Sequence, residues 1–499
     1  MENNQQFNIT TLFYDACKKY PERLAIIDKQ STISYSQLAQ EVHNTIHYFK
    51  EKGIQKGDRI LVFVSMGIDL YRIVLAIFSM GAIAVFVDEW VSIKRLSRCC
   101  NMASCKAFIA SKPIRCLGFF IREIRSIPIF LSHTKQLQTS NTPTPSSTLI
   151  TDTALITFTT GSTGIPKAIE RSHGYLQAQF NELHPLLQGS ISISMLPIVL
   201  LIQLGLGITS VIPSSQQTRF RKFNVKKILD QLEQYHVDSI IASPFYLLQL
   251  AEAKYTSNTL KHLISGGAPI YLSDAETIRH AFSTATFTLV YGSSEVEPIS
   301  YCDAEESIAN KQELGLYTGQ PVPTLSVKII PLLSPHISSE SMLNDQALVS
   351  GEIGEIIVSG NAVNKTYLNN PSAVMENKII TEKNVWHRTG DSGYINNRGQ
   401  LFLTGRVAQI IHHKQKTYYP FVIENKLKTI QGVIGGTLIA WNNKLYLIIC
   451  KTANFNQADL SEFDFDELHV VKQLPYDPRH HSKIDYAQLT KDISLKRRP

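Results

Sequence analysis

Cysteine is scarce in this sequence, and its spacing suits neither metal binding nor redox chemistry. The 499 residues include seven cysteines, and no two have the C-x-x-C spacing typical of zinc sites and dithiol redox centres. The odd number also argues against a complete set of disulfides, so we expect reduced thiols, as in a cytoplasm. The seven are Cys17, Cys99, Cys100, Cys105, Cys116, Cys302 and Cys450.

Apolar runs long enough to cross a membrane are also nearly absent. Ile73 to Val87 spans 15 residues, fewer than the roughly 20 that a transmembrane helix needs. Ile191 to Ile212 is long enough, but Pro197, Gly205 and Gly207 divide it. We therefore expect a buried strand, turn, helix and strand in this stretch. A membrane-anchored interaction protein stays open as the alternative.

A strong charge of one sign is missing as well. The net charge is +7, spread along the chain, and no basic stripe with interleaved aromatics predicts a nucleic-acid surface. Lys496, Arg497 and Arg498 form a short tail that we expect to be solvated. No signal peptide follows the polar start from Met1 to Gln6. The sequence thus predicts a cytoplasmic protein with no nucleic-acid partner and no transmembrane span.

The most informative segment is a strand-like run that ends in a loop of hydroxyls and glycines. Leu155 to Phe158 predicts a buried strand, and the loop after it leads through Pro166 to a lysine. Glycines let backbone amides approach an oxygen-rich group, hydroxyls donate hydrogen bonds, and the lysine adds positive charge. This suits a polyphosphate, with a plain surface loop as the alternative. The predicted phosphate-binding residues are Thr159, Thr160, Gly161, Ser162, Thr163, Gly164 and Lys167.

The loop is not a Walker A motif, because no glycine precedes the lysine. It resembles the phosphate loop of the adenylate-forming enzymes, which include acyl-CoA synthetases, peptide-synthetase adenylation domains and luciferases. The family pattern ends in Gly-x-Pro-Lys-Gly, and this chain departs only at the last position, where Ala168 stands. The resemblance covers about Phe7 to Leu489. It implies ATP and Mg²⁺ as cofactors and a carboxylic acid as substrate.

Two glycine turns resemble further motifs of the same family. By this resemblance, Tyr291 packs on adenine, Gly292 makes the tight turn of the nucleotide site, Ser294 reaches the α-phosphate or the substrate carboxylate, and Glu295 binds Mg²⁺. Magnesium prefers oxygen ligands and takes one or two carboxylates plus phosphate oxygens, which supports the role of the glutamate. We therefore predict Ser294 and Glu295 as catalytic residues. The second turn, beside adenine and the acyl group, contains Gly266, Gly267 and Ala268.

The segment from Trp386 to Tyr394 resembles a third family motif. The resemblance implies that Asp391 accepts hydrogen bonds from both ribose hydroxyls, as a carboxylate with two oxygens can. Tyr394, in the same motif, is predicted to contribute to the nucleotide site. Arg406 lies where relatives place an arginine on the ribose and phosphates.

Strands that alternate with helices dominate the first part of the chain, which argues for parallel βαβ units. Successive expected elements are a strand from Ile60 to Ser65, a helix from Ile68 to Met80 and a strand from Ile83 to Val87. We expect an α/β fold with a large N-terminal domain of parallel-rich sheets flanked by helices, over residues 1–406. A small mobile α+β domain is expected over 407–499. Pro331 to Leu348 is expected to be an exposed loop insertion.

The C-terminal part supplies the last expected catalytic group. Leu474 to Leu489 resembles the family's ending, and by that resemblance Lys483 is the catalytic lysine. Its ammonium would bridge carboxylate and phosphate oxygens that otherwise repel each other. Three positions depart from the family: Ala408 at the hinge, His412 in place of Lys, and Gln415 in place of a Gly that approaches the incoming thiol.

The implied activity is ATP-dependent activation of a carboxylic acid to an acyl-adenylate with release of pyrophosphate. The acyl group then passes to CoA or to the phosphopantetheine of a carrier protein. Val199 and Leu200 replace an aromatic–His pair of relatives, which suits a fatty or other apolar acid and equally a buried strand end. We thus expect a ligase of fatty acid metabolism. Ring closure of a β-hydroxy acid to a β-lactone, and a nucleotide-binding homologue without turnover, stay open as alternatives.

Overall fold

The structure is a computed structural model of the chain. It describes residues 5–29, 31–87, 92–135, 137–138, 145–160, 166–216, 222–253, 255, 257–333, 336–477 and 481–496, with the side chains of Leu117, Thr160, Leu495 and Lys496 left out. Within these ranges no helix has the length and hydropathy that a membrane crossing requires.

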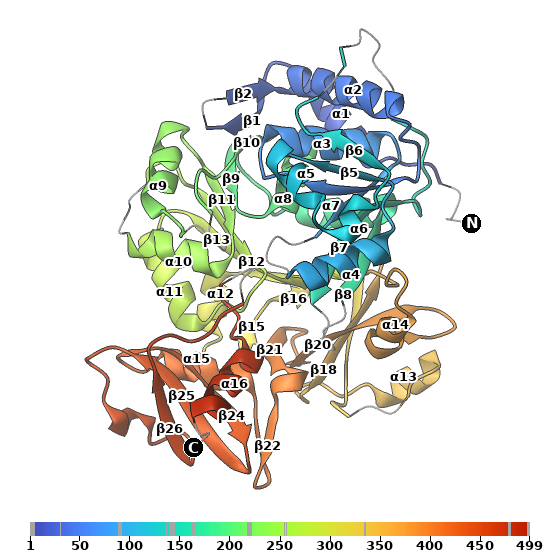
Figure 1. The fold of residues 1–499 in the computed structure, drawn as a ribbon. Coiled ribbons are helices and arrows are strands. Elements are labelled where there is room, and N and C mark those ends of the chain that lie inside the picture. The colour runs from blue at the N-terminus through green and yellow to red at the C-terminus, as the bar shows by residue number, and fades with distance from the viewer. Residues whose placement is uncertain are drawn as a thin grey trace.

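The largest sheet has nine strands, most of them parallel (Figure 1). Its six central strands run parallel, and β14, β16 and β2 are antiparallel at the two edges. In spatial order the strands are β16 (Gln320–Pro321), β14 (Val296–Asp303), β13 (Thr286–Ser293), β12 (His262–Gly266), β11 (Ser239–Ala242), β9 (Ile191–Ser194), β10 (Thr209–Val211), β1 (Leu24–Asp28) and β2 (Ser31–Ser34).

A second, six-stranded sheet is parallel except for its last strand. Its strands are β6 (Ile129–Ser132), β5 (Ala107–Ala110), β3 (Arg59–Phe63), β4 (Ile83–Phe86), β7 (Thr153–Thr160) and β8 (Pro166–Ser172). The predicted parallel-rich α/β architecture is therefore confirmed. The stretch Ile191 to Ile212 forms a strand, helix α8 (Pro197–Leu206) and a second strand, as expected.

Helices pack on these two sheets. Those near the N-terminus are α1 (Thr10–Lys19), α2 (Tyr35–Glu51), α3 (Ile68–Ser79), α4 (Ile93–Ala103), α5 (Lys112–Gly118) and α6 (Arg122–Arg125). Those that follow are α7 (His173–Leu183), α9 (Val225–Gln234), α10 (Pro244–Glu252), α11 (Leu272–Ala281) and α12 (Ala304–Ala309). The start of α2 shows how local sequence sets an element, because Ser34 and Gln37 form a reciprocal capping box there.

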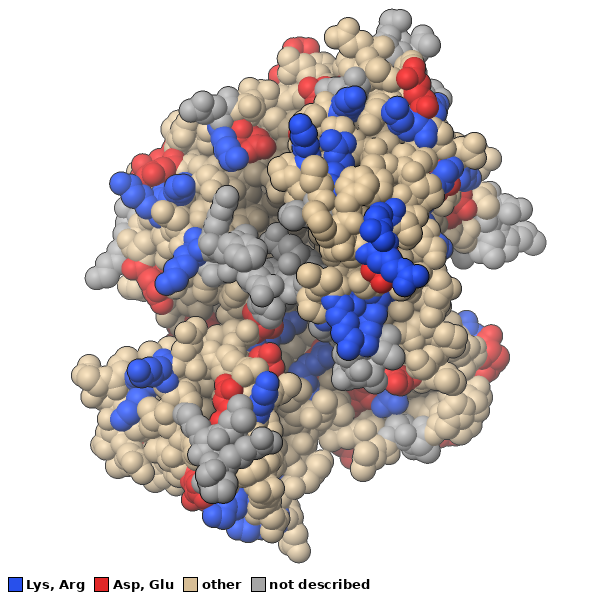
Figure 2. Space-filling model, viewed as in Figure 1, with Lys and Arg blue, Asp and Glu red and all other residues tan. Residues whose placement is uncertain are grey.

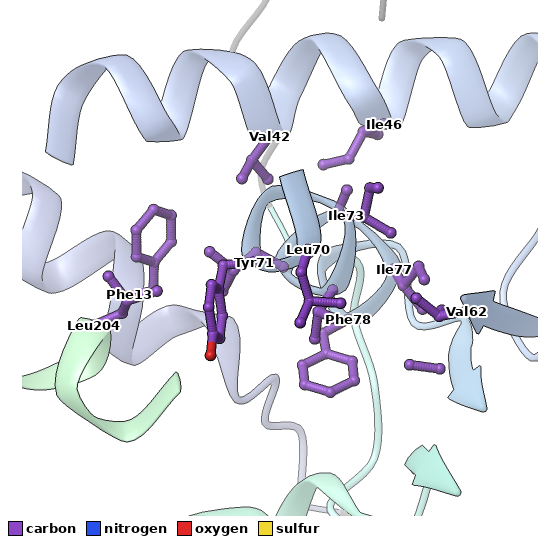
Figure 3. Packing of buried hydrophobic residues seen from close by; sticks show 14 of the residues in the cluster. Phe13, Val42, Ile46, Val62, Leu70, Tyr71, Ile73, Ile77, Phe78 and Leu204 are labelled. Carbon is purple, nitrogen blue, oxygen red and sulfur yellow. The ribbon is translucent and has the colours of Figure 1, made fainter. Parts of the chain in front are cut away.

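The main core joins α1, α2, α3 and α8 to both parallel sheets. Figure 3 shows side chains of these helices and of β3 turned toward one another. Full burial of a large apolar side chain contributes about 1.5–3 kcal/mol, so this cluster fixes the two sheets relative to each other. The labelled members are Phe13, Val42, Ile46, Val62, Leu70, Tyr71, Ile73, Ile77, Phe78 and Leu204.

A third sheet, which the sequence did not predict, is antiparallel throughout. Its strands are β15 (Leu316–Tyr317), β21 (Leu401–Arg406), β20 (Val385–Ile395), β18 (Gly354–Gly360), β17 (Leu325–Ile330) and β19 (Lys378–Ile380). Helices α13 (Glu340–Gln346) and α14 (Pro371–Asn377) accompany it. The prediction of an exposed loop insertion over Pro331 to Leu348 missed α13, a short helix that Ser339 caps and whose Leu343 is buried.

The chain ends in a small α+β region, the C-terminal lobe, after a short 3₁₀ turn, η2 (Val407–Gln409). The lobe lies at the lower left of Figure 1, beneath the nine-stranded sheet. Its elements are β22 (Ile411–His413), β23 (Lys416–Tyr418), α15 (Pro420–Lys428), β24 (Val433–Trp441), β25 (Lys444–Lys451), η3 (Gln457–Leu460), β26 (Glu467–Val471) and α16 (Tyr486–Lys496).

Candidate active site

Three of the predicted motifs meet near the ends of strands from different sheets. Strand β13 ends in the Tyr291–Glu295 turn, and Gly266 at the end of β12 pairs with Val290 beside it. The guanidinium of Arg171 on β8 donates to the carbonyl of Ser294 at 2.6 Å and to Thr157 Oγ1 at 2.7 Å. This arginine therefore ties the turn to the strand that leads into the predicted phosphate loop.

A bonded cluster forms around Asp391. Arg406 Nη1 lies 2.8 Å from Asp391 Oδ1, and the Tyr291 hydroxyl donates to Oδ2 at 2.9 Å. Asp391 and Arg406 are a cross-strand pair of β20 and β21. The carboxylate raises the pKa of Arg406, while burial and then Asp391 raise that of Tyr291. A carboxylate offers about four lone pairs, so Asp391 keeps acceptor capacity for ribose hydroxyls.

Glu295 is half-buried, with lysines among its neighbours. The Tyr367 hydroxyl donates to its Oε1 at 3.1 Å. Burial alone would raise the pKa of Glu295, but His387, Lys378, the Tyr367 hydroxyl and Lys167 together lower it. The glutamate is therefore ionised at neutral pH and has the hard oxygen that Mg²⁺ prefers.

Two lysines flank this carboxylate. Lys167 donates to Asn377 Oδ1 at 2.8 Å, and its ammonium lies 5.7 Å from the centre of the Tyr367 ring. Lys378 is 5% exposed, donates to the carbonyl of Asn364 and lies 5.1 Å from the same ring. Burial lowers the pKa of Lys378 to about 7, although Glu295 opposes the shift. Lys378, Tyr367 and Arg171 belong to no motif that the sequence revealed, and only the fold brings them to Glu295.

The phosphate loop is described only at its two ends. Thr159 is the penultimate residue of β7, and its buried hydroxyl has no hydrogen-bond partner among the described residues. Lys167 lies at the start of β8. The predictions for Gly161, Ser162, Thr163 and Gly164, and for the side chain of Thr160, fall outside the described residues. A buried hydroxyl that no other described residue pairs, beside a lysine, fits a site that a phosphate oxygen completes.

The predicted glycine turns have the geometry that requires glycine. Gly267 has φ +83°, a conformation that side chains disfavour, and Ala268 follows it. A Cβ on Gly292 would come within 2.9 Å of the carbonyl oxygen of Val296. Both turns therefore bring bare backbone to the same strand ends as Tyr291.

Among the predicted nucleotide residues that the structure describes, Tyr394 turns away from this cluster. It is 5% exposed, its ring stacks on Phe402 at 5.0 Å, and its hydroxyl bonds Glu313 at 3.4 Å. Tyr394 and Phe402 both belong to a buried apolar cluster, so the Tyr394 ring packs in the core, whereas Asp391 bonds Tyr291 and Arg406.

Lys483 lies in a loop that returns toward the nine-stranded sheet. Its backbone N–H donates to Asp477 Oδ1 at 3.0 Å, and a bridge from Tyr476 to Ile484 closes the loop. The ring of His481 lies 5.2 Å from that of Phe245, at the start of α10. This contact docks the loop beside the carboxyl end of β11, on the same edge of the sheet as Gly266.

A second set of contacts joins the C-terminal lobe to the rest of the chain. Buried Glu424 on α15 accepts from the hydroxyls of Tyr271 and of Tyr486 in its own lobe. Lys428 lies 2.6 Å from Asp274 in a largely buried ion pair. The backbone N–H of Leu272 donates to Asn425 Oδ1 at 2.9 Å. These contacts fix the lobe, and with it the Lys483 loop, in this orientation.

Glu295 is a carboxylate close to Lys167 of the phosphate loop. Within the described part of the chain, no group of three or more His, Cys, Asp and Glu could hold an ion. Mg²⁺ commonly binds through one or two carboxylates plus substrate phosphates. The residues present therefore fit an ion that arrives with a polyphosphate and contacts Glu295.

Comparison with solved structures shows that the fold is known. The chain superposes on the amide bond synthetase McbA from Marinactinospora thermotolerans with a TM-score of 0.82 at 18% identity, covering 97% of this chain and 99% of that one. It superposes on O-succinylbenzoate coenzyme A synthetase (MenE) from Bacillus subtilis, in complex with ATP and magnesium ion, with a TM-score of 0.78 at 19% identity. That match covers 97% of this chain and 100% of the other.

Curated proteins give matches over most of the chain. An olefin beta-lactone synthetase of Stenotrophomonas maltophilia is 26% identical over 474 residues, covering 87% of this chain and 86% of that protein. The putative acyl-CoA ligase YdaB of Bacillus subtilis is 24% identical over 510 residues, covering 94% and 95%. The family model described as AMP-binding enzyme matches residues 13–368. The chain thus belongs to the AMP-binding enzymes of the adenylate-forming superfamily.

Proposed function

We propose that this chain activates an apolar carboxylic acid with Mg·ATP, forming an acyl-adenylate and releasing pyrophosphate. The observation that supports this most is the bonded cluster of Tyr291, Asp391 and Arg406, which lies near ionised Glu295. A nucleoside site beside a site for a phosphate-bound cation is the arrangement that adenylation needs. The family membership supports the same reaction.

Charged and polar side chains would bind different parts of Mg·ATP. Asp391 and Arg406 hold the ribose, while Lys167 and the Thr159 hydroxyl bind β- and γ-phosphate oxygens. When bound at Glu295, Mg²⁺ neutralises negative charge on the phosphates. The substrate carboxylate attacks the α-phosphorus, the bond to the bridging oxygen breaks, and pyrophosphate leaves with that electron pair. Such phosphorus chemistry depends mainly on positioning and charge neutralisation.

Lys483 supplies the last charge, from a separate lobe. We place the domain boundary between residues 406 and 407, so that residues 407–499 form a lid that carries the lysine. Its ammonium bridges the incoming carboxylate and the α-phosphate, whose negative charges repel each other. The docking of His481 on Phe245 supports an approach to the edge of the sheet where Gly266 lies.

The acyl-adenylate has two candidate fates. In the first, the sulfur of CoA or of a carrier phosphopantetheine attacks the acyl carbon, AMP leaves, and the thiol proton is lost to solvent. In the second, the β-hydroxyl oxygen of the acid attacks the same carbon, AMP leaves as a β-lactone ring closes, and the hydroxyl proton is lost to solvent. Gln415 favours the second route. It adopts φ +62° in the β22–β23 turn, so the turn keeps a glycine-like backbone but adds a side chain where a thiol would arrive.

Exchange of labelled pyrophosphate into ATP tests the first step. Fatty, hydroxy, amino and aryl acids are compared one by one with wild type and Lys483→Ala. We expect exchange that requires an apolar acid and is lost in the variant. Saturable ATP binding without exchange for any acid would support a homologue without turnover. Two product assays then separate the fates. Consumption of CoA indicates thioester formation, and a product that equals a β-hydroxy acid minus one water indicates the β-lactone.

A further inference from the structure

The positive charge of this chain is concentrated in one short segment. Residues 93–126, from α4 through α6, contain eight of the 49 Lys and Arg but one of the 42 Asp and Glu. The segment therefore carries +7, and the remaining residues hold 41 of each sign. The excess that looked spread along the sequence is local.

Helices α4 and α6 present this charge side by side. Lys94 and Arg98 are four residues apart on α4, and Arg122 and Arg125 are three apart on α6, so each pair shares a helix face. All four side chains are exposed. Figure 2 shows Lys and Arg gathered on the face of the molecule over these helices. The acidic residue of the segment, Glu123, accepts a hydrogen bond from Ser97 at 2.8 Å.

Two adjacent aromatic side chains lie in the same segment, at the turn between α5 and α6. Phe120 is 86% exposed and Phe119 is 52% exposed. The Phe119 ring stacks on Phe130 at 4.9 Å, which holds the turn in place. Exposed phenylalanines are costly in water unless something covers them. The arginines Arg122 and Arg125 follow directly, so apolar and cationic groups are exposed together.

We propose that this α4–α6 surface, made of Lys94, Arg98, Phe119, Phe120, Arg122 and Arg125, binds an anionic lipid bilayer. Surface-bound elements combine Lys and Arg with Phe or Leu, and the apolar groups enter the boundary between headgroups and acyl chains. Guanidinium groups make strong charge-assisted bonds to phosphate oxygens. The surface matches an anionic membrane in charge and supplies the phenylalanines that such an interface buries.

A membrane fits better than an acidic protein or a nucleic acid. A protein partner would have to bring a pocket that fits Phe120, and a single strand of nucleic acid needs a basic groove with stacking platforms. A bilayer accepts projecting phenylalanines without a matched pocket. The proposal does not depend on the proposed catalytic function, because binding to lipid is measured without turnover.

Co-sedimentation with vesicles tests the proposal. We expect wild type to bind vesicles of phosphatidylcholine with about one third phosphatidylglycerol, and not phosphatidylcholine alone. Binding should fall when salt shortens the screening length from about 8 Å to about 3 Å. Each basic residue near an anionic surface contributes about fivefold in affinity, so Arg122→Gln with Arg125→Gln should weaken binding about 25-fold. Phe120→Ser should weaken it about tenfold.

Matched controls separate this surface from charge in general. Lys226 and Lys227 are exposed on α9, and Lys226→Gln with Lys227→Gln should bind as wild type does. Leu333 is 93% exposed, so Leu333→Ser is the control for Phe120→Ser. Cys116 on α5 is exposed, whereas the other six cysteines are buried. A polarity-sensitive fluorophore on Cys116 should therefore shift to the blue when vesicles are added.

Three outcomes would overturn the proposal. Wild type does not bind the anionic vesicles, or the arginine variant binds them as wild type does. In the third, wild type binds heparin but not vesicles, and heparin binding requires the Arg122 and Arg125 side chains. That result would assign the surface to a soluble polyanion. Unchanged pyrophosphate exchange in every variant shows that the fold is intact and keeps this test separate from the catalytic one.

Discussion

The contact between Tyr271 and Glu424 gives the sharpest prediction about lobe docking. Tyr271 precedes α11 in the N-terminal part of the chain, and its hydroxyl donates to a carboxylate on α15 of the C-terminal lobe. Tyr486 donates to the same carboxylate from within the lobe. Tyr271→Phe therefore removes a bond between lobes, whereas Tyr486→Phe removes a bond of the same kind inside one lobe.

The expected size follows from the charge of the acceptor. Burial raises the pKa of Glu424 to about 6, so the carboxylate is ionised at pH 8. A hydrogen bond to a charged group contributes about 1.5–3 kcal/mol. Its loss in Tyr271→Phe should lower the ratio of docked to undocked lobe by about tenfold to 150-fold. Tyr486→Phe should leave that ratio nearly unchanged, because its bond is present in both states.

Hydrogen exchange at the amide of Leu272 measures docking directly. This residue is in the first turn of α11, where a backbone N–H has no partner within the helix, and it donates to Asn425 of the lobe. We expect exchange at Leu272 to accelerate at least about tenfold in Tyr271→Phe and little in Tyr486→Phe. Equal acceleration in both variants, or none in either, would refute the idea that this bond holds the lobe.

Three further predictions concern single side chains. The folded-state pKa of Glu424 is about 6, above the ordinary value of 4.5. The stability that its protonated carboxyl contributes to the folded protein is therefore complete below pH 4.5, and about 2 kcal/mol of it is lost as the pH rises through 6. The free energy of unfolding of Glu424→Gln in urea should not show that loss over the same pH range. A pH profile of stability equal to that of wild type would contradict the account. At pH 6, where Lys378 with its pKa of about 7 is mostly charged, Lys378→Met should lower the Mg²⁺ concentration for half-maximal pyrophosphate exchange about tenfold by removing a nearby cation; a purely structural lysine predicts a higher requirement. Thr159→Val should weaken ATP binding. The free energy of unfolding should stay the same or rise by up to about 1 kcal/mol, because the Thr159 hydroxyl is unpaired among the described residues. Unchanged ATP affinity would contradict the role of Thr159 in phosphate binding.

Sequence reasoning found the parts of the site that are local in the chain. The turn from Tyr291 to Glu295 and the Asp391 motif are each contiguous, so their resemblance to family motifs could be seen directly. The pairing of Asp391 with Arg406 then follows from two adjacent strands of one sheet. The alternating βαβ pattern likewise predicted both parallel sheets.

The remaining parts depend on residues that are distant in sequence. Tyr367 lies 72 residues from Glu295, and Asn377 lies 210 residues from Lys167. No spacing rule connects such positions, and Lys378 gives no sign in the sequence that it is buried. Tyr394 was grouped with the nucleotide site by its motif alone, whereas its ring stacks on Phe402 in the core.

Binding of Mg·ATP, measured by calorimetry, tests the central claim that these dispersed segments form one adenylation site. Wild type should bind, and Asp391→Ala should weaken binding by about tenfold to 100-fold, because it removes a charged acceptor from the nucleoside. Lys483→Ala should bind ATP nearly as wild type does while it loses pyrophosphate exchange. The claim is contradicted if wild type does not bind ATP, or if Asp391→Ala binds it with unchanged affinity.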